Sequence, residues 1–578
     1  MKYPALAPRK TVKNRITVFQ GLNKTPRIGV GELADMENLT SDRYPVLSPR
    51  QPRGILEIAG TASGMIAKDC LCWVEGREFV MNGVRVDLGL AEGQKNLVSM
   101  GAYVIILPDK VWINTLDLTR YGSLDAGFST DTDVVFQLSS VTGENMGTPE
   151  VSPNEPENPV SGSLWLNTVE NVLYRYSDTA GWELLSAVYV KISAPGIGSA
   201  FSRYDGVKIS GIRVAELEEL NGDRVIWHRG EDYIVISGLI SRQMTQLASE
   251  GAVTVERRMP EMDFVVEAGN RLWGCRYGLS RDGQLVNELY ASRLGDFKNW
   301  NCFMGVSTDS WRASVGSDGP FTGAVTYQGY PLFFKENCLH KIYISDLGGH
   351  SVREIVCRGV QSGCGESLAI VKELLYYKSR DGVCAYDGSI PEDISRKLGK
   401  LTCRRAAGGA GNGKYYLSVE AEEGSWQMFV WDPERRLWHR EDAFGAAAFC
   451  QCREELYAIE SKTGKIYGLL GTLEPESGKV KWMAETGDLE ITEAESRYLH
   501  RLQLQLLLPL GASLRISARY DDDSFWTYLC SFRGTGLQRF LLPIRPRRCS
   551  HMRLRLEGEG PGMLYAIVRT GEKGSERL

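Results

Sequence analysis

Residues 324–357 read AVTYQGYPLFFKENCLHKIYISDLGGHSVREIVC, with four extended runs at 324–327, 331–335, 339–345 and 352–357. Aromatic and β-branched residues fill each run, and Gly, Asn, Asp or Pro separate the runs, which is the signal of short strands joined by turns. The same pattern returns in the next two segments of the chain, 367–398 and 406–442. Sheets of four strands that recur about every 40 to 45 residues are typical of a β-propeller. The sequence therefore predicts an all-β protein organised around a propeller.

The predicted propeller occupies two separate parts of the chain, residues 56–132 and residues 251–485. Strand quartets at 64–88 and 97–124 supply the first blades, and further quartets follow in the second part. Together they predict about six to eight blades, with seven as the preferred number. The last blade is expected to end near residues 479–485.

Three segments outside the propeller have a different character. Residues 1–55 contain six prolines and predict an extended N-terminal arm that lies on its own propeller or on a neighbouring subunit. The strand period is lost in residues 133–250, which predicts an inserted small β domain, or more than one, in a surface loop between blades. Residues 486–578 alternate polar and apolar positions, as at 500–506, and predict a C-terminal β-sandwich-like domain.

Composition excludes several classes of protein. The net charge of −5 gives no general attraction for nucleic acid or for an anionic membrane. The first residues, MKYPALAP, lack the apolar stretch of a signal peptide, and no segment approaches the roughly 20 apolar residues that a membrane span needs. We therefore expect a protein that is made in the cytoplasm and has no membrane partner.

Several short sequences resemble those of phage virion proteins that form the nozzle or hub of a short tail. The first is DMENLTSDRYPVLSPR at residues 35–50. The others are GDFKNW at 295–300, LFFKEN at 332–337 and GVCAYDG at 382–388, which are similar to the propeller of that family. The region around Trp165, Tyr174 and Trp182 resembles the small inserts that are common in phage tail proteins.

The resemblance implies a structural component of a bacteriophage tail, located in the virion and made in the cytoplasm of the host bacterium. It implies a ring of identical subunits, a hexamer in short-tailed phages, below the portal and adaptor and around the channel through which DNA leaves. The implied partners are further copies of the chain, other tail and adaptor proteins, and DNA in passing. Cyclic assemblies close through heterologous contacts, so the arm would hold the next subunit. Asn38, Tyr44, Pro45 and Arg50 are the candidate residues of this arm, and no enzymatic activity is expected.

Two alternatives give the protein a ligand. In the first, a tail-tip receptor-binding protein recognises host-surface glycan, with Trp165, Tyr174 and Trp182 stacking on sugar rings. The same residues are also expected as the core of a small module that has few other apolar residues to bury. In the second, a propeller glycosidase would need two or three carboxylates that converge on the axis. Asp309, Asp318, Asp387 and Asp432 are available, but each lies in a turn context.

Other motifs favour ordinary structural roles, and no catalytic, metal-binding or cofactor-binding residue is predicted. The glycine-rich stretch 408–414 is followed by a strand and lacks the Ser or Thr of a phosphate loop, which predicts a hairpin turn. The triplet 521–523 lacks the spacing of a calcium loop and predicts a solvated hairpin tip. The pairs Cys70/Cys72 and Cys450/Cys452 are interpreted as small buried residues, since His partners are few. An arginine cluster forms either a solvated or subunit-facing surface or a contact for passing DNA: Arg545, Arg547, Arg548, Arg553 and Arg555.

Overall fold

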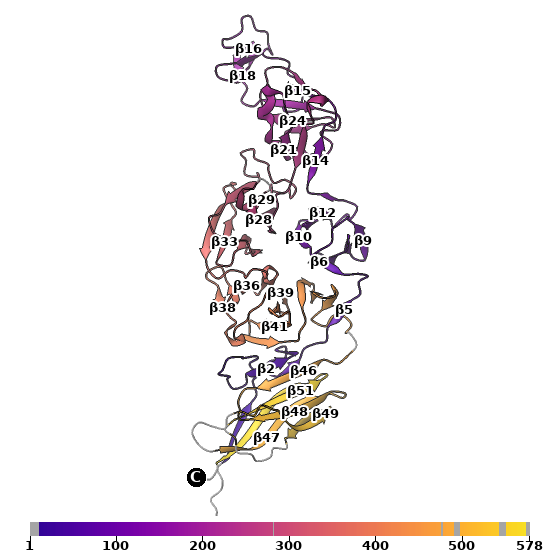
Figure 1. Ribbon diagram of the computed structural model, residues 1–578, viewed down its shortest axis with the longest axis vertical. Coiled ribbons are helices and arrows are strands. Elements are labelled where there is room, and N and C mark those ends of the chain that lie inside the picture. The colour runs from indigo at the N-terminus through magenta and orange to yellow at the C-terminus, as the bar shows by residue number, and fades with distance from the viewer. Residues whose placement is uncertain are drawn as a thin grey trace, which may run out of the picture.

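The computed structural model describes residues 11–280, 283–475, 478–489, 497–542, 549 and 551–573. Strands make up nearly all of its regular structure, and they form three bodies in a row (Figure 1). The propeller lies in the middle, the inserted domain lies at one end and a β-sandwich lies at the other. None of the helical turns in the described residues is long and apolar enough to cross a bilayer.

Seven four-stranded antiparallel sheets surround the centre of the middle body within the described residues. The first two contain β6 (Ala62–Ala67), β7 (Leu71–Glu75), β8 (Glu78–Met81) and β9 (Val84–Asp87), then β10 (Asn96–Met100), β11 (Tyr103–Leu107), β12 (Val111–Asn114) and β13 (Tyr121–Ser123). The next two contain β27 (Phe264–Ala268), β28 (Arg271–Leu279), β29 (Leu285–Ala291) and β30 (Trp311–Ser314), then β31 (Gly323–Tyr327), β32 (Tyr330–Phe334), β33 (Cys338–Tyr343) and β34 (Ser351–Val356). The fifth and sixth contain β35 (Ala369–Val371), β36 (Leu374–Ser379), β37 (Gly382–Tyr386) and β38 (Glu392–Asp393), then β39 (Arg405–Gly411), β40 (Lys414–Glu420), β41 (Trp426–Asp432) and β42 (Leu437–Arg440).

The last sheet closes the ring with a strand from the start of the chain. It contains β43 (Ala446–Cys452), β44 (Glu455–Glu460), β45 (Ile466–Gly468) and β5 (Gly54–Leu56), and Tyr467 pairs with Ile55. First strands of neighbouring sheets contact one another around most of the ring, and a 3-10 turn, η3 (Gly365–Ser367), lies between β31 and the following sheets and contacts both β31 and β39. The predicted propeller is therefore confirmed. The strand near residues 479–485, however, belongs to the sandwich, and β5 takes the place that the sequence had suggested for it.

Large side chains fill the space between neighbouring sheets. Trp273, Trp438 and Tyr415 are fully buried, and Tyr376 stacks on Tyr415 with 5.3 Å between ring centres. Central strands such as β40 are buried on both faces along their whole length. This is why these strands appear in the sequence as continuous apolar runs rather than as alternating patterns.

The β-sandwich is built from both ends of the chain. One sheet has the order β1 (Thr11–Ile16), β52 (Met563–Lys573), β47 (Arg497–Leu508), β50 (Gly536–Leu541). The other has the order β2 (Leu33–Glu37), β46 (Lys481–Thr486), β51 (Met552–Glu559), β48 (Ser513–Tyr520), β49 (Thr527–Arg533). Buried and exposed positions alternate along β51, as the sequence predicts for a sandwich. The described part of the predicted arm is thus paired with its own chain.

The inserted domain enters after β13 and returns at β27. Two sheets enclose its core: β14 (Ala126–Ser129), β26 (Thr254–Arg257), β21 (Gly206–Ser210) and β22 (Gly222–Val225), and β23 (His228–Arg229), β24 (Tyr233–Ser237), β20 (Tyr189–Ser193), β15 (Val134–Ser139) and β25 (Met244–Gln246). A third sheet, which we call the tip module, lies farthest from the propeller (Figure 1). It contains β16 (Glu150–Ser152), β17 (Leu164–Asn167), β18 (Val172–Ser177) and β19 (Gly181–Leu184). Short 3-10 turns complete the described elements: η1 (Ala215–Leu220), η2 (Ala248–Glu250) and η4 (Arg396–Leu398).

Residues 33–56, which we call the strap, run from the sandwich across the propeller to β5, and include a small hairpin of β3 (Leu39–Thr40) and β4 (Ser48–Pro49). Arg53 donates to Glu441 at 2.7 Å and to Asp442 at 2.8 Å, and its side chain is 10% exposed. Ser41 donates to Asp432 at 2.5 Å. The strap therefore joins the two bodies through buried polar contacts.

We predict that Arg53→Met lowers the free energy of unfolding by about 3–5 kcal/mol, because it removes one of the two buried arginines, Arg50 and Arg53, that neutralise Glu441 and Asp442. Chemical denaturation followed by tryptophan fluorescence measures this loss. Arg77→Met is the matched control, because Arg77 and Asp87 form an exposed pair whose loss costs less than about 1 kcal/mol. Equal losses in the two variants would show that the strap contact does not stabilise the fold.

Candidate functional site

The tip module brings together all three of the aromatic residues that the sequence analysis singled out. Trp165 stacks on Tyr174 with ring centres 5.0 Å apart, and Trp182 meets Trp165 edge to face at 5.6 Å. Trp165 is only 5% exposed, and its indole donates to the carbonyl of Ser152 at 3.0 Å. Tyr174 and Trp182 are half-buried. Trp165 is thus the centre of an aromatic cluster whose outer rings are partly accessible.

The opposite face of the same sheet is also apolar. Leu164, Leu166 and Leu173 point away from the aromatic rings and join the core of the inserted domain. The expectation that the module has few other apolar residues to bury is therefore wrong. Alternate residues of a strand face opposite sides of the sheet, so the leucines form a second apolar face behind the aromatic residues. The module is held down by its leucine face, and its aromatic face is turned outwards.

The candidate arm residues lie within the strap or beside it. Asn38 is buried, accepts from the Nε of Arg50 at 2.8 Å and donates to the carbonyl of Lys481 at 2.9 Å. The guanidinium of Arg50 also forms an ion pair with Asp442 at 3.0 Å. The Pro45 carbonyl accepts from the amide of Phe19, and Tyr44, which is 37% exposed, lies under the guanidinium of Arg435. Asn38 and Arg50 therefore contribute to contacts inside one chain.

The four aspartates considered for catalysis do not converge. Asp309 accepts three backbone amides of residues 304–306, and Asp387 accepts from the amide and hydroxyl of Ser389. Asp432 accepts from Ser41 and from the amides of residues 434 and 435, while Asp318 is exposed. Asp309 and Asp387 stabilise turns in their own segments, and Asp432 stabilises both a turn and the strap. They form no common site.

The remaining sequence motifs have structural positions. Residues 408–414 form the β39–β40 hairpin with its turn at Asn412 and Gly413, as predicted. Residues 521–523 lie in the turn after β48. Arg545, Arg547 and Arg548 lie outside the described residues. Arg553 and Arg555 form ion pairs with Glu485 and Asp488, so this part of the cluster is occupied within the chain.

Cys450 and Cys452 lie in β43 of the last sheet. Cys72 lies in β7 of the first sheet, and Cys70 lies in the turn before β7. Cys72 and Cys452 are buried, and Cys70 and Cys450 are partly buried. Burial raises the pKa of Cys450 to about 12, which keeps this thiol protonated. Within the residues that the structure describes, no group of three or more His, Cys, Asp or Glu side chains is placed to hold a metal ion.

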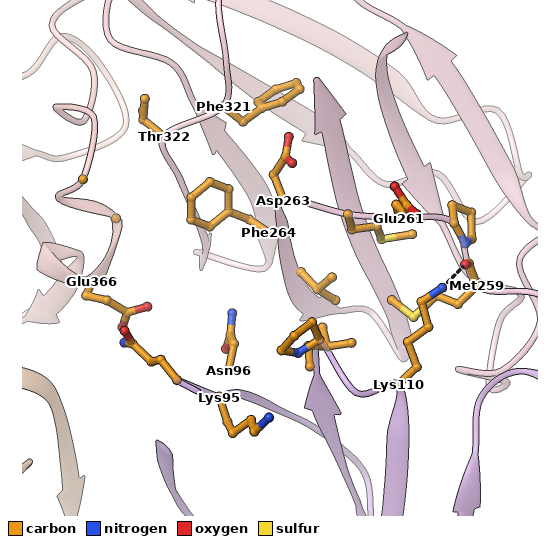
Figure 2. Close-up of a pocket in the computed structure, with 18 of the residues that line it drawn as sticks. Lys95, Asn96, Lys110, Met259, Glu261, Asp263, Phe264, Phe321, Thr322 and Glu366 are labelled. Atoms are coloured by element: carbon orange, nitrogen blue, oxygen red, sulfur yellow. Dashed lines mark hydrogen bonds between the residues drawn. The ribbon is translucent and has the colours of Figure 1, made fainter. Parts of the chain in front are cut away.

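A cavity of about 720 Å³ opens beside the centre of the ring (Figure 2). It is bounded by the start of β10, the β11–β12 turn, residues 259–265, Phe321 and the segment around η3. A second hollow, lined by the first strands of five sheets, shares Asn96, Phe264 and Glu366 with it. The two together reach the axis of the propeller, and we call the first the axial cavity.

Most charged groups at the axial cavity have a partner in the protein. Lys95 donates to Asp109 at 2.7 Å, and Lys110 donates to the carbonyl of Met259 at 2.8 Å. Asp263 accepts from Arg276 at 2.8 Å and from the amide of Tyr277 at 2.7 Å. The lysines are thus neutralised or anchored before any ligand arrives.

Glu366 is the exception among these groups. It lies in η3, and its carboxylate has no hydrogen bond or ion pair in the described part of the chain. The side chain is reached from the cavity, yet surrounding protein removes much of its water, and this desolvation raises the pKa of Glu366 above its ordinary value. Figure 2 shows Glu366, Asn96 and Asp263 around the same space. A carboxyl group in such a place is suited to hold a proton or to bind a cation.

Glu366 was not among the candidate site residues predicted from the sequence. It lies in the sequence Cys-Gly-Glu-Ser at 364–367, which matches no reaction motif. A Glu in the loop that precedes a predicted first strand would have been the only signal, because first strands line the axis of a propeller.

No family model and no curated protein matches the sequence. Similar solved structures include the exo-beta-1,3-galactanase of Phanerochaete chrysosporium, at 9% identity over 53% of this chain and 94% of that chain, with a TM-score of 0.22. The sialidase of Trypanosoma rangeli matches at 10% identity over 89% of this chain and 96% of that chain, with a TM-score of 0.22. The acylaminoacyl peptidase of Pyrococcus horikoshii matches at 12% identity over 56% of each chain, with a TM-score of 0.25. TM-scores this low carry no argument about a shared reaction.

The expectation that the chain is not an enzyme is nevertheless corrected. Several of the similar structures are named as enzymes, among them a galactanase, a sialidase and a glycoside hydrolase, while another is named as a surface component of a secretion system. The expectation also depended on four aspartates in turns, whereas the carboxylates at the axial cavity are Glu261, Asp263 and Glu366.

We predict that Trp165→Ala lowers the stability of the tip module by about 3–5 kcal/mol, because it removes the buried ring on which Tyr174 and Trp182 pack. Hydrogen exchange of the amides in β17 and β18 measures this local loss. Val169→Ala is the control in the same module, since Val169 is 76% exposed and its truncation should change exchange little. Unchanged exchange in Trp165→Ala would mean that the leucine face alone holds the module.

Proposed function

We propose that the protein is a structural component of a bacteriophage tail that assembles as a ring of identical subunits. One observation carries the proposal: three of the sequences that resemble the nozzle and hub family, residues 35–50, 295–300 and 332–337, lie where the bodies and blades of this chain are joined. Residues 35–50 belong to the strap between sandwich and propeller. The partners are then further copies of the chain and the tail or adaptor proteins next to it, and the location is the virion.

The second resembling sequence lies at the other joint. Asn299 is fully buried, accepts from the amide of Gly206 at 3.0 Å and donates to the carbonyl of Tyr204 at 2.6 Å. Phe297 and Trp300 pack beside Val98 in a core shared by neighbouring blades. A chain whose distinctive sequences fix the relative positions of its parts is suited to an assembly that must keep its shape under load.

The third resembling sequence joins two blades. Lys335 is buried, and its ammonium donates to Asn287 at 2.9 Å and to the carbonyl of Ser317 at 2.7 Å, both in the preceding sheet or the connection that follows it. A propeller is stabilised by such contacts between nearest neighbours. This supports a rigid disc with the inserted domain and the sandwich as separate surfaces for neighbours in the particle.

We predict that the purified full-length protein forms closed rings, hexameric by the resemblance, in negative-stain electron microscopy. Antibody raised against it should label the tail of intact particles. A protein that stays monomeric at every concentration and is absent from particles would overturn the proposal.

A second candidate function is the hydrolysis of a glycosidic bond at the axial cavity. The observation that favours it is the unpaired Glu366 in the same cavity as Asp263, whose carboxylate is held by Arg276. In such a reaction one carboxylic acid protonates the leaving oxygen, and a second carboxylate assists the attack of water or of the enzyme on the sugar. The raised pKa of Glu366 fits the acid role.

We predict for this candidate that polysaccharide from bacterial surfaces releases reducing ends, and that Glu366→Gln abolishes the release. Activity should fall as pH rises through the pKa of Glu366, because the acid form is lost. Asp387→Asn is the control, since Asp387 caps a turn and does not line the cavity. Equal activity in Glu366→Gln and wild type would exclude Glu366 as the acid.

A further inference from the structure

Four exposed polar side chains at the axial cavity have no partner within the described residues. They are the carboxylate of Glu366, the hydroxyl of Ser362, and the side-chain amides of Gln94 and Asn96, which come from the segment at the start of β10. Elsewhere around the cavity, polar side chains are engaged, as Thr322 is with the carbonyl of Phe334. Unengaged hydrogen-bonding groups in a concave site are the usual marks of a ligand position.

The charge of the cavity is negative. Lys95 faces Asp109, and Lys110 lies 3.5 Å from Asp125, so neither lysine offers a free positive charge. Arg276 lies between Asp263 at 2.8 Å and Glu261 at 3.7 Å. Glu366 therefore adds a charge that nothing in the described chain compensates. An anionic ligand such as a phosphate or a uronate would be repelled, and a cation would be attracted.

The walls of the cavity also have apolar faces. Phe264 contributes a ring, and Pro108 and Pro260 contribute flat aliphatic surfaces. Sugar rings pack their C–H faces against such surfaces while their hydroxyls bind amides and carboxylates. The volume of about 720 Å³ is within the usual range for small-molecule sites.

We infer that the axial cavity binds a cationic sugar, an amino sugar whose ammonium group pairs with Glu366 and whose hydroxyls bind Gln94 and Asn96. The inference shares its location with the second candidate function but requires no bond to break. Binding without hydrolysis would leave it intact, and it is independent of whether the chain forms rings. A simple polyamine satisfies the charge but not the amides or the flat walls.

The test is a calorimetric titration of the full-length protein with the trimer of glucosamine, beside the neutral trimer of N-acetylglucosamine and the polyamine spermidine. We expect the glucosamine trimer to bind at least about tenfold more tightly than either of the others, the order that a charge-assisted hydrogen bond and the added hydroxyl contacts give. Glu366→Gln keeps the shape of the side chain and should remove this preference. Glu392→Gln is the matched control, because Glu392 is exposed on β38, the outer strand of the sheet that follows η3, and does not line the cavity.

Absence of heat and of chemical-shift change with the glucosamine trimer, in protein whose thermal unfolding is normal, would overturn the inference. Binding that is unchanged in Glu366→Gln would overturn it as well, and spermidine binding as tightly as the trimer would exclude the sugar. Reducing-end release is measured on the same samples. Binding without release would contradict hydrolysis alone, and ring formation in the microscope reports on the tail proposal separately.

Discussion

Closure of the ring is the constraint on which the rest of the structure depends. Without a segment from the start of the chain, the last sheet would have three strands, and its outer strand β45 would expose unpaired backbone groups. Here β5, from residues 54–56, pairs with β45 of the last sheet. The same N-terminal segment has already supplied β1 and β2 to the sandwich. One segment therefore closes the ring and ties the C-terminal body to it.

The sandwich and the propeller share one apolar core, and buried polar contacts also join the three bodies. Arg53 in the strap joins Glu441 and Asp442 of the propeller, and Asn299 joins the propeller to the inserted domain. Removing charges from water is costly, so such pairs add little to net stability. Their geometry is strict, however, because each donor must meet its acceptor at a fixed distance and angle. The contacts therefore fix how the bodies sit relative to one another, which an apolar interface would specify less sharply.

Local patterns in the sequence predict the strands and the propeller well, because strands and tight turns depend on residues that are close together in the chain. Local patterns do not indicate which distant segments of the chain pair with each other. Nothing near Gly54 indicates that it pairs with Gly468, and the prolines of residues 1–55 predicted an extended arm on its own propeller or on a neighbouring subunit. The aromatic residues of the tip module were found because three rings in a short segment are conspicuous. Glu366 was missed because its importance depends on which loop faces the axis and on the lack of a partner nearby.

Glu366 differs from other acidic residues of the propeller because its carboxylate has no hydrogen-bond or ion-pair partner within the described residues. Asp432 and Glu420 are buried but accept several hydrogen bonds or ion pairs, so their charges are compensated. Glu366 has no such partner in the described part of the chain, and although its side chain is exposed to the cavity, desolvation by the surrounding protein raises its pKa and disfavours the charged form. Proteins break such local rules mainly at functional sites. The cavity wall opposite Glu366 is formed by residues 259–263, the segment by which the chain returns from the inserted domain, and Lys110 holds that segment at Met259. A ligand that compensates Glu366 would therefore also touch the joint that positions the inserted domain, so that a structural role and a ligand-binding role can belong to one molecule.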